Sequence, residues 1–140
     1  MTDENKFFQI NVAIVTISDT RSLHNDKSGD VLFERVKKFG HKITIREIVK
    51  DDFTKISDLF LKLIKKDDID VIISTGGTGL TGRDITPEVM KTLFEKNIDG
   101  FGEMFRWLSY RKIGTSALQS RALAGVANGK YIFCLPGSPS

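Results

Sequence analysis

Short apolar runs alternate along this chain with longer stretches in which apolar residues recur every three or four positions. Val12–Ile17 is β-branched and apolar at consecutive positions, as in a strand buried on both faces of a parallel sheet. Asp70–Ser74 and Tyr131–Leu135 predict two further strands. Lys42–Val49 begins with alternating polar and apolar residues, which predicts a strand nearer the sheet edge.

Helical periodicity fills the gaps between these strands. The clearest amphipathic pattern repeats at i, i+3, i+4, i+7 and i+8 and predicts a helix over 56–64, with its apolar face formed by Ile56, Leu59, Phe60, Leu63 and Ile64. An earlier helix is expected along Val31–Phe39, and Gly40 can terminate it.

Three more helices are expected in the second half of the chain. One covers Thr86–Phe94, with Thr86 as the N-cap and Pro87 at the first helical position. The other two are expected near Glu103–Arg111 and Ser116–Val126.

The order of these elements predicts an α/β fold, with a mainly parallel sheet and helices on both faces. In such sheets ligands bind beyond the carboxyl ends of the strands. The unusual chemistry of the chain follows predicted strands, in the segments Ser18-Asp19, Asp51-Asp52, Gly76–Gly79 and Pro136–Pro139. The sequence therefore predicts a site at one rim of the sheet.

Composition narrows the class of protein. The 140 residues fit one domain, expected to span residues 1–140, and 40% hydrophobic content excludes disorder of the whole chain. The 21 Lys and Arg exceed the 18 Asp and Glu by only three, which argues against nucleic acid or an anionic membrane as partner. The single cysteine, Cys134, excludes a disulfide framework.

Neither a secretory signal nor a membrane helix is indicated. Met1–Lys6 is polar and acidic, without the basic start and apolar run of a signal peptide. No uncharged apolar stretch approaches the roughly 20 residues that a membrane helix needs. A cytoplasmic, soluble protein is therefore the default expectation.

The glycine-rich segment Gly77–Gly82 literally matches the dinucleotide pattern G-x-G-x-x-G and follows a predicted strand. The match is poor, because the next helix signal comes only at Thr86. A Walker A loop is also excluded, because Arg83-Asp84 stands where Lys-Ser/Thr is needed. An ordinary flexible connection is the alternative interpretation.

Physical chemistry still favours an anion site at this loop. Glycine-rich turns expose backbone amides, and Arg83 adds positive charge. Asp84 could hold Mg²⁺, with Asp51 as second carboxylate if the two strand ends converge. Taken alone, Asp51-Asp52 is more often a solvated turn or a helix cap.

Several motifs stand in a fixed order along nearly the whole chain: Val15–Asp19, Val49–Asp51, Thr75–Gly79, Arg83-Asp84, Thr86–Glu88, Gly100–Glu103 with Arg106, Ser120-Arg121 and Pro136–Pro139. In this order they resemble the MoaB/Mog family of molybdenum cofactor biosynthesis, whose fold the gephyrin G domain shares. Val49–Asp51 and Gly114–Ala122 are most similar to the MoaB branch.

The resemblance implies a three-layer α/β/α sandwich that assembles as a homotrimer or hexamer. It implies a molybdopterin adenylyltransferase, which uses Mg²⁺ and ATP to adenylylate the phosphate of molybdopterin before molybdate insertion, releasing pyrophosphate. Relatives usually continue past the Pro-Gly-x-Pro loop, so the chain, which stops at Ser140, is expected to lack their C-terminal helix.

The same resemblance assigns roles to individual residues. Asp51 and Asp84 look like the essential acidic pair, catalytic and able to hold the metal. Substrate binding is assigned to the glycine loop and further walls of the site: Ser18, Asp19, Thr75, Gly76, Gly77, Thr78, Gly79, Arg83, Glu103, Gly137 and Ser138.

Two rival functions stay open from the sequence. One is a pterin-binding or scaffold protein of the same pathway without transfer activity. The other is a dinucleotide-binding oxidoreductase, disfavoured by the late helix start and by the lack of a second, substrate-binding domain.

Overall fold

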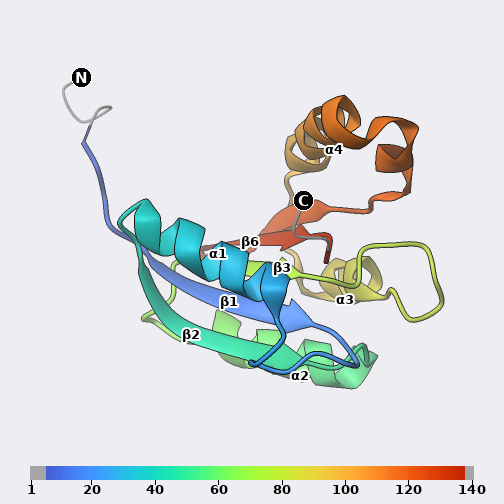
Figure 1. Cartoon of the computed structure of the whole chain (residues 1–140). Coiled ribbons are helices and arrows are strands. Elements are labelled where there is room, and N and C mark those ends of the chain that lie inside the picture. Colours follow the sequence, from blue (N-terminus) through green and yellow to red (C-terminus); the bar gives the residue numbers. More distant parts are fainter. Residues whose placement is uncertain (1–5, 138–140) are drawn as a thin grey trace.

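A computed structural model describes residues 6–137 of the chain. These residues form one six-stranded sheet with helices on both faces (Figure 1). In chain order the elements are β1 (Asn11–Ile17), α1 (Lys27–Lys38), β2 (Lys42–Val49), α2 (Phe53–Ile64), β3 (Val71–Thr75), α3 (Thr86–Leu93), β4 (Lys96–Asn97), α4 (Asp99–Ile113), the 3₁₀ helix η2 (Gly114–Gln119), β5 (Leu123–Ala127) and β6 (Lys130–Leu135).

The sheet has the strand order β2-β1-β3-β6-β5-β4. The first four strands in this order run parallel, whereas β5 runs antiparallel to both β6 and β4. The prediction of a mainly parallel sheet with Lys42–Val49 at its edge is thus confirmed. Thr75 lies opposite both Thr16 of β1 and Leu135 of β6, so three strands end together at one rim.

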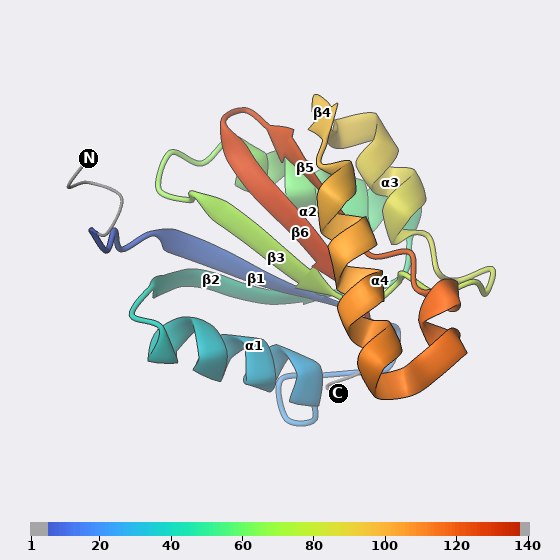
Figure 2. The ribbon, with the colours of Figure 1, turned by 90° about the horizontal axis from the view of Figure 1, so that it is seen from above.

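Helices cover both faces of the sheet. Seen from above, α1 and α4 lie in front of the sheet and α2 and α3 lie behind it (Figure 2). This arrangement is the expected three-layer α/β/α sandwich. Among the described residues, no helix is long and apolar enough to span a membrane.

The core lies between the parallel strands and α2. Ile72 of β3 and Ile132 of β6 are fully buried, as are Ile56 and Phe60 on the predicted apolar face of α2. Burial of each such side chain stabilises the fold by about 1.5–3 kcal/mol. Helix α2 begins at the N-cap Asp52, whose carboxylate accepts a hydrogen bond from the Lys55 amide at 2.9 Å. Asp52 therefore serves as the cap of α2, so only Asp51 of this pair is available to the candidate site.

The prediction of a helix over Ser116–Val126 is wrong. The chain there forms the short helix η2 and then the antiparallel strand β5, which pairs with β4, a strand that the sequence did not indicate. Gly125 explains the difference, because a Cβ at that position would lie 2.3 Å from the ring of Phe94. A glycine inside a strand often marks such a close approach by another element.

Two helix starts also differ from prediction. Helix α1 begins before Val31, because the buried Asp26 caps it by accepting a hydrogen bond from the Gly29 amide at 3.1 Å. Thr86 is the first residue of α3 and not its N-cap; that position is taken by Ile85, which makes no side-chain capping bond.

Candidate functional site

A cavity of about 790 Å³ opens at the rim where β1, β3 and β6 end. Its size lies within the range of roughly 300–1,000 Å³ that is typical of small-molecule sites. Residues from α1 and α4 extend its walls along one face of the sheet, among them Leu32, Arg35, Phe105 and Lys112.

Most of the predicted site residues line this cavity: Ser18, Asp51, Thr75, Gly76, Gly77, Thr78, Gly79, Asp84 and Gly137. Asp19 lines an adjoining hollow of about 450 Å³. Glu103 lies on an exposed part of α4, and the structure does not bring it into the cavity. Ser138 lies outside the described residues.

The glycine loop has a conformation that requires glycine. Gly76 and Gly77 adopt φ angles of +108° and +73°. A Cβ on Gly76 would lie 2.2 Å from the carbonyl oxygen of Ile17, and one on Gly77 would lie 2.2 Å from the Thr86 hydroxyl. The interpretation of this segment as an ordinary flexible connection is therefore disfavoured, because both glycines are needed for close packing.

The start of α3 is fastened to the glycine loop. The buried Thr86 hydroxyl donates to the Gly76 carbonyl at 3.2 Å, and the Thr86 amide donates to the Gly77 carbonyl at 3.1 Å. The hydroxyl predicted to cap the helix thus holds the loop instead.

Three successive amides of the loop are free to bind a ligand. Within residues 6–137, no protein acceptor pairs with the backbone N–H groups of Gly77, Thr78 and Gly79, whereas the Gly76 amide donates to Leu135 at 2.9 Å. Consecutive unpaired amides in a glycine-rich turn are a common anion-binding arrangement. All three residues line the cavity.

Asp84 is held within its own turn. Its Oδ2 accepts hydrogen bonds from the Thr81 amide at 2.9 Å and from the Thr81 hydroxyl at 2.7 Å. The Asp84 amide returns a bond to the Thr81 carbonyl at 3.0 Å. The carboxylate orientation is therefore fixed by the protein itself.

Asp51 lies in a less favourable environment, just beyond β2. Burial raises the pKa of its carboxyl above the ordinary value, and the charges of Asp19 and Asp84 raise it further. Arg83 and the backbone amide of Asp19 oppose these effects only in part. Asp51 and Asp84, from distant parts of the chain, therefore lie close enough for their carboxylates to repel each other beside one cavity.

Arg83 pairs with Asp19 at the edge of the site. Its Nε and Nη2 donate to the two carboxylate oxygens of Asp19 at 3.0 and 2.9 Å, and this pairing holds the pKa of Asp19 below its usual value. Arg83, whose positive charge was expected to bind an anion, is thus already paired with Asp19. The sequence offered no sign of this pairing across 64 positions.

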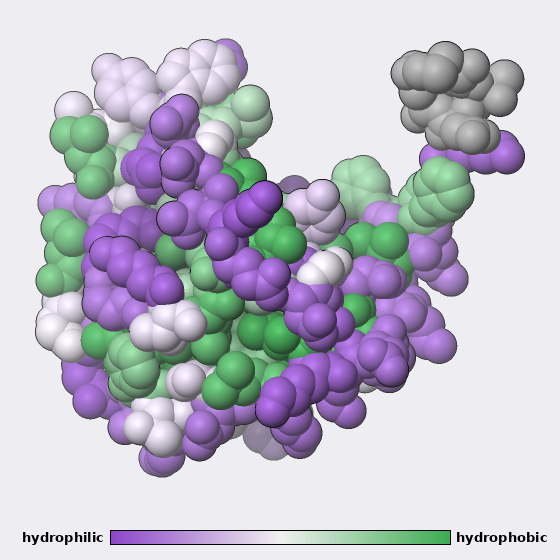
Figure 3. Space-filling model, turned by 180° about the vertical axis from the view of Figure 1, so that it is seen from behind, coloured by the Kyte–Doolittle hydropathy of each residue, from purple (hydrophilic) through white to green (hydrophobic). Residues whose placement is uncertain are grey.

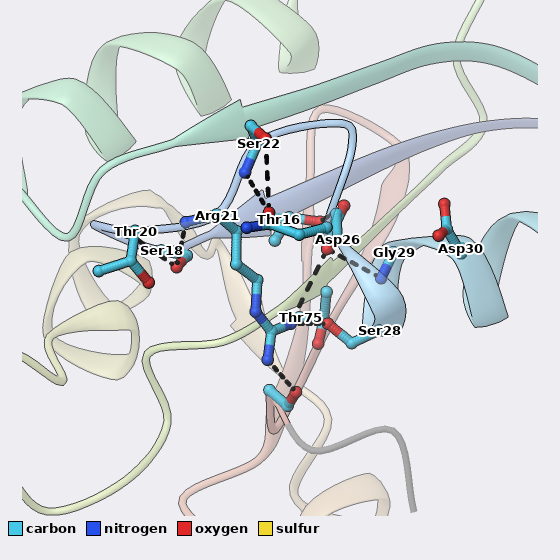
Figure 4. A network of polar contacts seen from close by, with 12 residues as sticks. Thr16, Ser18, Thr20, Arg21, Ser22, Asp26, Ser28, Gly29, Asp30 and Thr75 are labelled. Atoms are coloured by element: carbon cyan, nitrogen blue, oxygen red, sulfur yellow. Dashed lines mark hydrogen bonds and ion pairs between the residues drawn. The ribbon is translucent and has the colours of Figure 1, made fainter.

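Arg21 lines the cavity but was not predicted (Figure 4). Its guanidinium donates to the Ser28 hydroxyl and, at 3.2 Å, to the carbonyl of Gly137. Nearby, the fully buried Asp26 accepts from the Thr16 hydroxyl at 2.7 Å and pairs with Arg46 at 3.2 Å. This network joins the loop after β1 to the segment after β6. The only signal in the sequence was an aspartate placed to cap a helix.

Comparison with known proteins identifies relatives of the whole domain. Residues 13–140 match the family described as "Probable molybdopterin binding domain". Molybdenum cofactor biosynthesis protein B of Bacillus cereus is 49% identical over 131 residues, which cover 93% of this chain and 78% of the relative. The protein of the same name from Escherichia coli is 44% identical over 133 residues, which cover 95% of this chain and 78% of the relative.

Solved structures agree with these relatives. A crystal structure of molybdenum cofactor biosynthesis protein B superposes with a TM-score of 0.91 at 48% identity, covering 94% of this chain and 83% of that chain. The tungsten cofactor synthesizing protein MoaB from Pyrococcus furiosus superposes with a TM-score of 0.83 at 36% identity, covering 94% and 84%.

Proposed function

Because this chain belongs to the molybdopterin-binding domain family, we propose that it acts in molybdenum cofactor biosynthesis by adenylylating molybdopterin. The observation that supports this most is that three free amides and two carboxylates lie at the same cavity. The amides of Gly77, Thr78 and Gly79 suit a phosphate, and Asp51 and Asp84 suit a cation bound to it.

The proposed reaction is a transfer of AMP. A terminal phosphate oxygen of molybdopterin attacks the α-phosphorus of ATP, and a new P–O bond forms. The bond from the α-phosphorus to the bridging oxygen breaks, and the electron pair leaves with pyrophosphate. No group is oxidised or reduced, and the attacking phosphate is already ionised near neutral pH. The protein therefore needs to position phosphates and balance charge, without a strong general base.

The residues present fit a magnesium ion. Asp51 and Asp84 would supply hard oxygen ligands, and a bound cation would relieve the repulsion between them. Among residues 6–137 no group of three or more His, Cys, Asp or Glu side chains is arranged to hold a metal. Magnesium commonly takes one or two carboxylates and completes its shell with substrate phosphates and water. When bound, it would neutralise charge on the reacting phosphates.

The decisive experiment supplies molybdopterin, ATP and Mg²⁺ to the purified protein. We expect pyrophosphate and adenylyl-molybdopterin to form in equal amounts. Pterin binding without either product would favour the non-catalytic, scaffold role. Binding of NAD without pterin would favour the oxidoreductase.

We also propose that the chain assembles as a homotrimer or hexamer. Several large apolar side chains of α4 are exposed, and the lobe at the upper left of Figure 3, which contains α4, shows pale and green side chains among purple ones. Trp107 is 60% exposed, and Met104 and Leu108 lie beside it on the same helix. Exposed apolar groups concentrated on one element commonly mark an interface. Analytical ultracentrifugation of the protein tests this assembly, and a monomer at micromolar concentration would contradict it.

A further inference from the structure

Arg121 joins three parts of the site that lie far apart in the sequence. It stands in the segment between η2 and β5, where its Nε donates to the Gly79 carbonyl at 2.8 Å. Its Nη2 donates to the Asp84 carbonyl at 2.6 Å, and its Nη1 pairs with the Glu88 carboxylate of α3 at 2.5 Å. The Arg121 amide also donates to the Thr78 carbonyl at 2.8 Å.

These contacts fall where the glycine loop has least support of its own. The amides of Thr78 and Gly79 have no protein acceptor within residues 6–137, and the Asp84 carboxylate accepts hydrogen bonds only from Thr81 of its own turn among these residues. The planar guanidinium reaches a carbonyl on each side of this turn. Its fork of donors has a fixed geometry, which an ammonium group cannot reproduce.

The segment that carries Arg121 is itself held by α4. Arg106 donates from Nη1 to the carbonyls of Ser120 and Ala122, at 3.3 and 2.9 Å, on both sides of Arg121. Gly102 permits this close approach, because a Cβ there would lie 2.8 Å from the Ala122 carbonyl. The backbone around Arg121 is thus held by α4 in addition to the bond that its own amide makes to the loop.

We propose that Arg121 is a positioning residue for the Asp84 carboxylate and for the free amides of the glycine loop. It acts through the backbone carbonyls of Gly79 and Asp84, and Glu88 holds the guanidinium in place through a paired charge. This inference rests on the proposed adenylyl transfer. Misplaced loop groups lower the rate of transfer more than they lower binding, because transfer depends on precise alignment of the phosphates.

Four variants test the proposal: Arg121→Met, Arg121→Lys, Glu88→Gln and the control Lys38→Met, which removes an equal charge from the exposed end of α1, outside the cavity. Amide hydrogen exchange is followed in residues 78–84, where the hydrogen-bonded amides of Thr81 and Asp84 report on the turn, and, as an internal reference, in α2. Steady-state kinetics are measured with molybdopterin and ATP.

In Arg121→Met we expect exchange in residues 78–84 to accelerate at least about tenfold, with α2 unchanged. We expect kcat to fall about 100-fold, while KM for either substrate changes less than about threefold. Arg121→Lys keeps the charge without the fork and is expected to recover only part of kcat. Glu88→Gln is expected to fall between Arg121→Met and the wild type, and Lys38→Met to match the wild type.

Unchanged exchange in residues 78–84 of Arg121→Met would overturn the proposal whatever the kinetics show. Faster exchange with a loss expressed in KM alone would also overturn it. If the wild-type protein transfers no adenylyl group, the proposed function fails, and the exchange measurement still decides whether Arg121 holds the loop. If Arg121→Met does not fold, the comparison of Glu88→Gln and Arg121→Lys with Lys38→Met decides in the same way.

Discussion

The two acidic residues of the cavity are held in opposite ways. Asp84 accepts two hydrogen bonds from Thr81 and is fastened through its carbonyl by Arg121. The Asp51 carboxylate has no side-chain donor among the described residues, and burial together with two neighbouring carboxylates raises its pKa. Asp84 is thus positioned by the protein, whereas Asp51 carries a charge that the free protein stabilises poorly. A cation or a hydrogen-bond donor bound in the cavity would therefore offset more unfavourable charge at Asp51 than at Asp84.

Replacement of Asp51 has the largest expected effect and separates activity from stability. In Asp51→Asn we expect adenylyl transfer to fall by about 10³-fold or more, equivalent to about 4 kcal/mol of transition-state stabilisation. Stability at pH 7 should stay equal or rise slightly, because an unfavourable buried charge is removed. The measurements are kcat/KM and urea denaturation. Destabilisation by more than about 1 kcal/mol would show that Asp51 has a structural role instead.

Asp84→Asn is expected to damage both properties. The rate of adenylyl transfer should fall by about 10²-fold or more, because the oriented carboxylate is gone, while molybdopterin binding is kept. The amide keeps one acceptor oxygen but weakens the bonds from Thr81, so stability should fall by about 0.5–1.5 kcal/mol. Calorimetric titration with the pterin and urea denaturation check these outcomes. Retained turnover would refute the role given to Asp84.

Thr86→Val is expected to have a smaller effect than replacement of Asp51 or Asp84, because Thr86 acts only through the glycine loop. The change keeps the side-chain shape but removes the buried hydroxyl that donates to the Gly76 carbonyl. We expect a loss of about 1–2 kcal/mol in unfolding free energy, since the carbonyl is left without this donor. Thr92→Val is the matched control, because its hydroxyl donates to a carbonyl of its own helix. Equal losses in the two variants would contradict a special role for Thr86.

The parallel part of the fold could be predicted because its signals are local. Val12–Ile17 and the apolar face of α2 follow the periods of a buried strand and an amphipathic helix, and the structure confirms both. Ser116–Val126, which contains several helix-favouring Ala and Leu residues, was predicted as a helix. There β5 forms through pairing with β6 and through the Phe94 ring beside Gly125, which are contacts that a local pattern does not contain.

The candidate site shows the same division. Residues at the strand ends could be placed at one rim, because parallel strands end together. The partners of these residues could not be predicted. Arg83 pairs with Asp19, which is 64 positions away, and Arg121 donates to the carbonyl of Asp84, which is 37 positions away. A single sequence shows that arginines are present, but only the folded chain shows which of their charges are already engaged.

The smallest expected effect is a dependence of stability on pH that comes from Asp51. The pKa of Asp51 is raised from 3.8, so at intermediate pH the folded state binds more protons than the unfolded state. Unfolding then releases protons, and the stabilising contribution of protonated Asp51 is lost as pH rises from about 3.8 through the raised pKa. Partial exposure limits the difference to less than about 1 kcal/mol.

Urea denaturation of the wild type and of Asp51→Asn between pH 3 and pH 7 measures this contribution. The stability of Asp51→Asn relative to the wild type should rise with pH over that window and become constant above it. A constant difference between Asp51→Asn and the wild type across that window would mean that the fold does not raise the pKa of Asp51, and the contrast between a held and an unheld carboxylate would then be wrong.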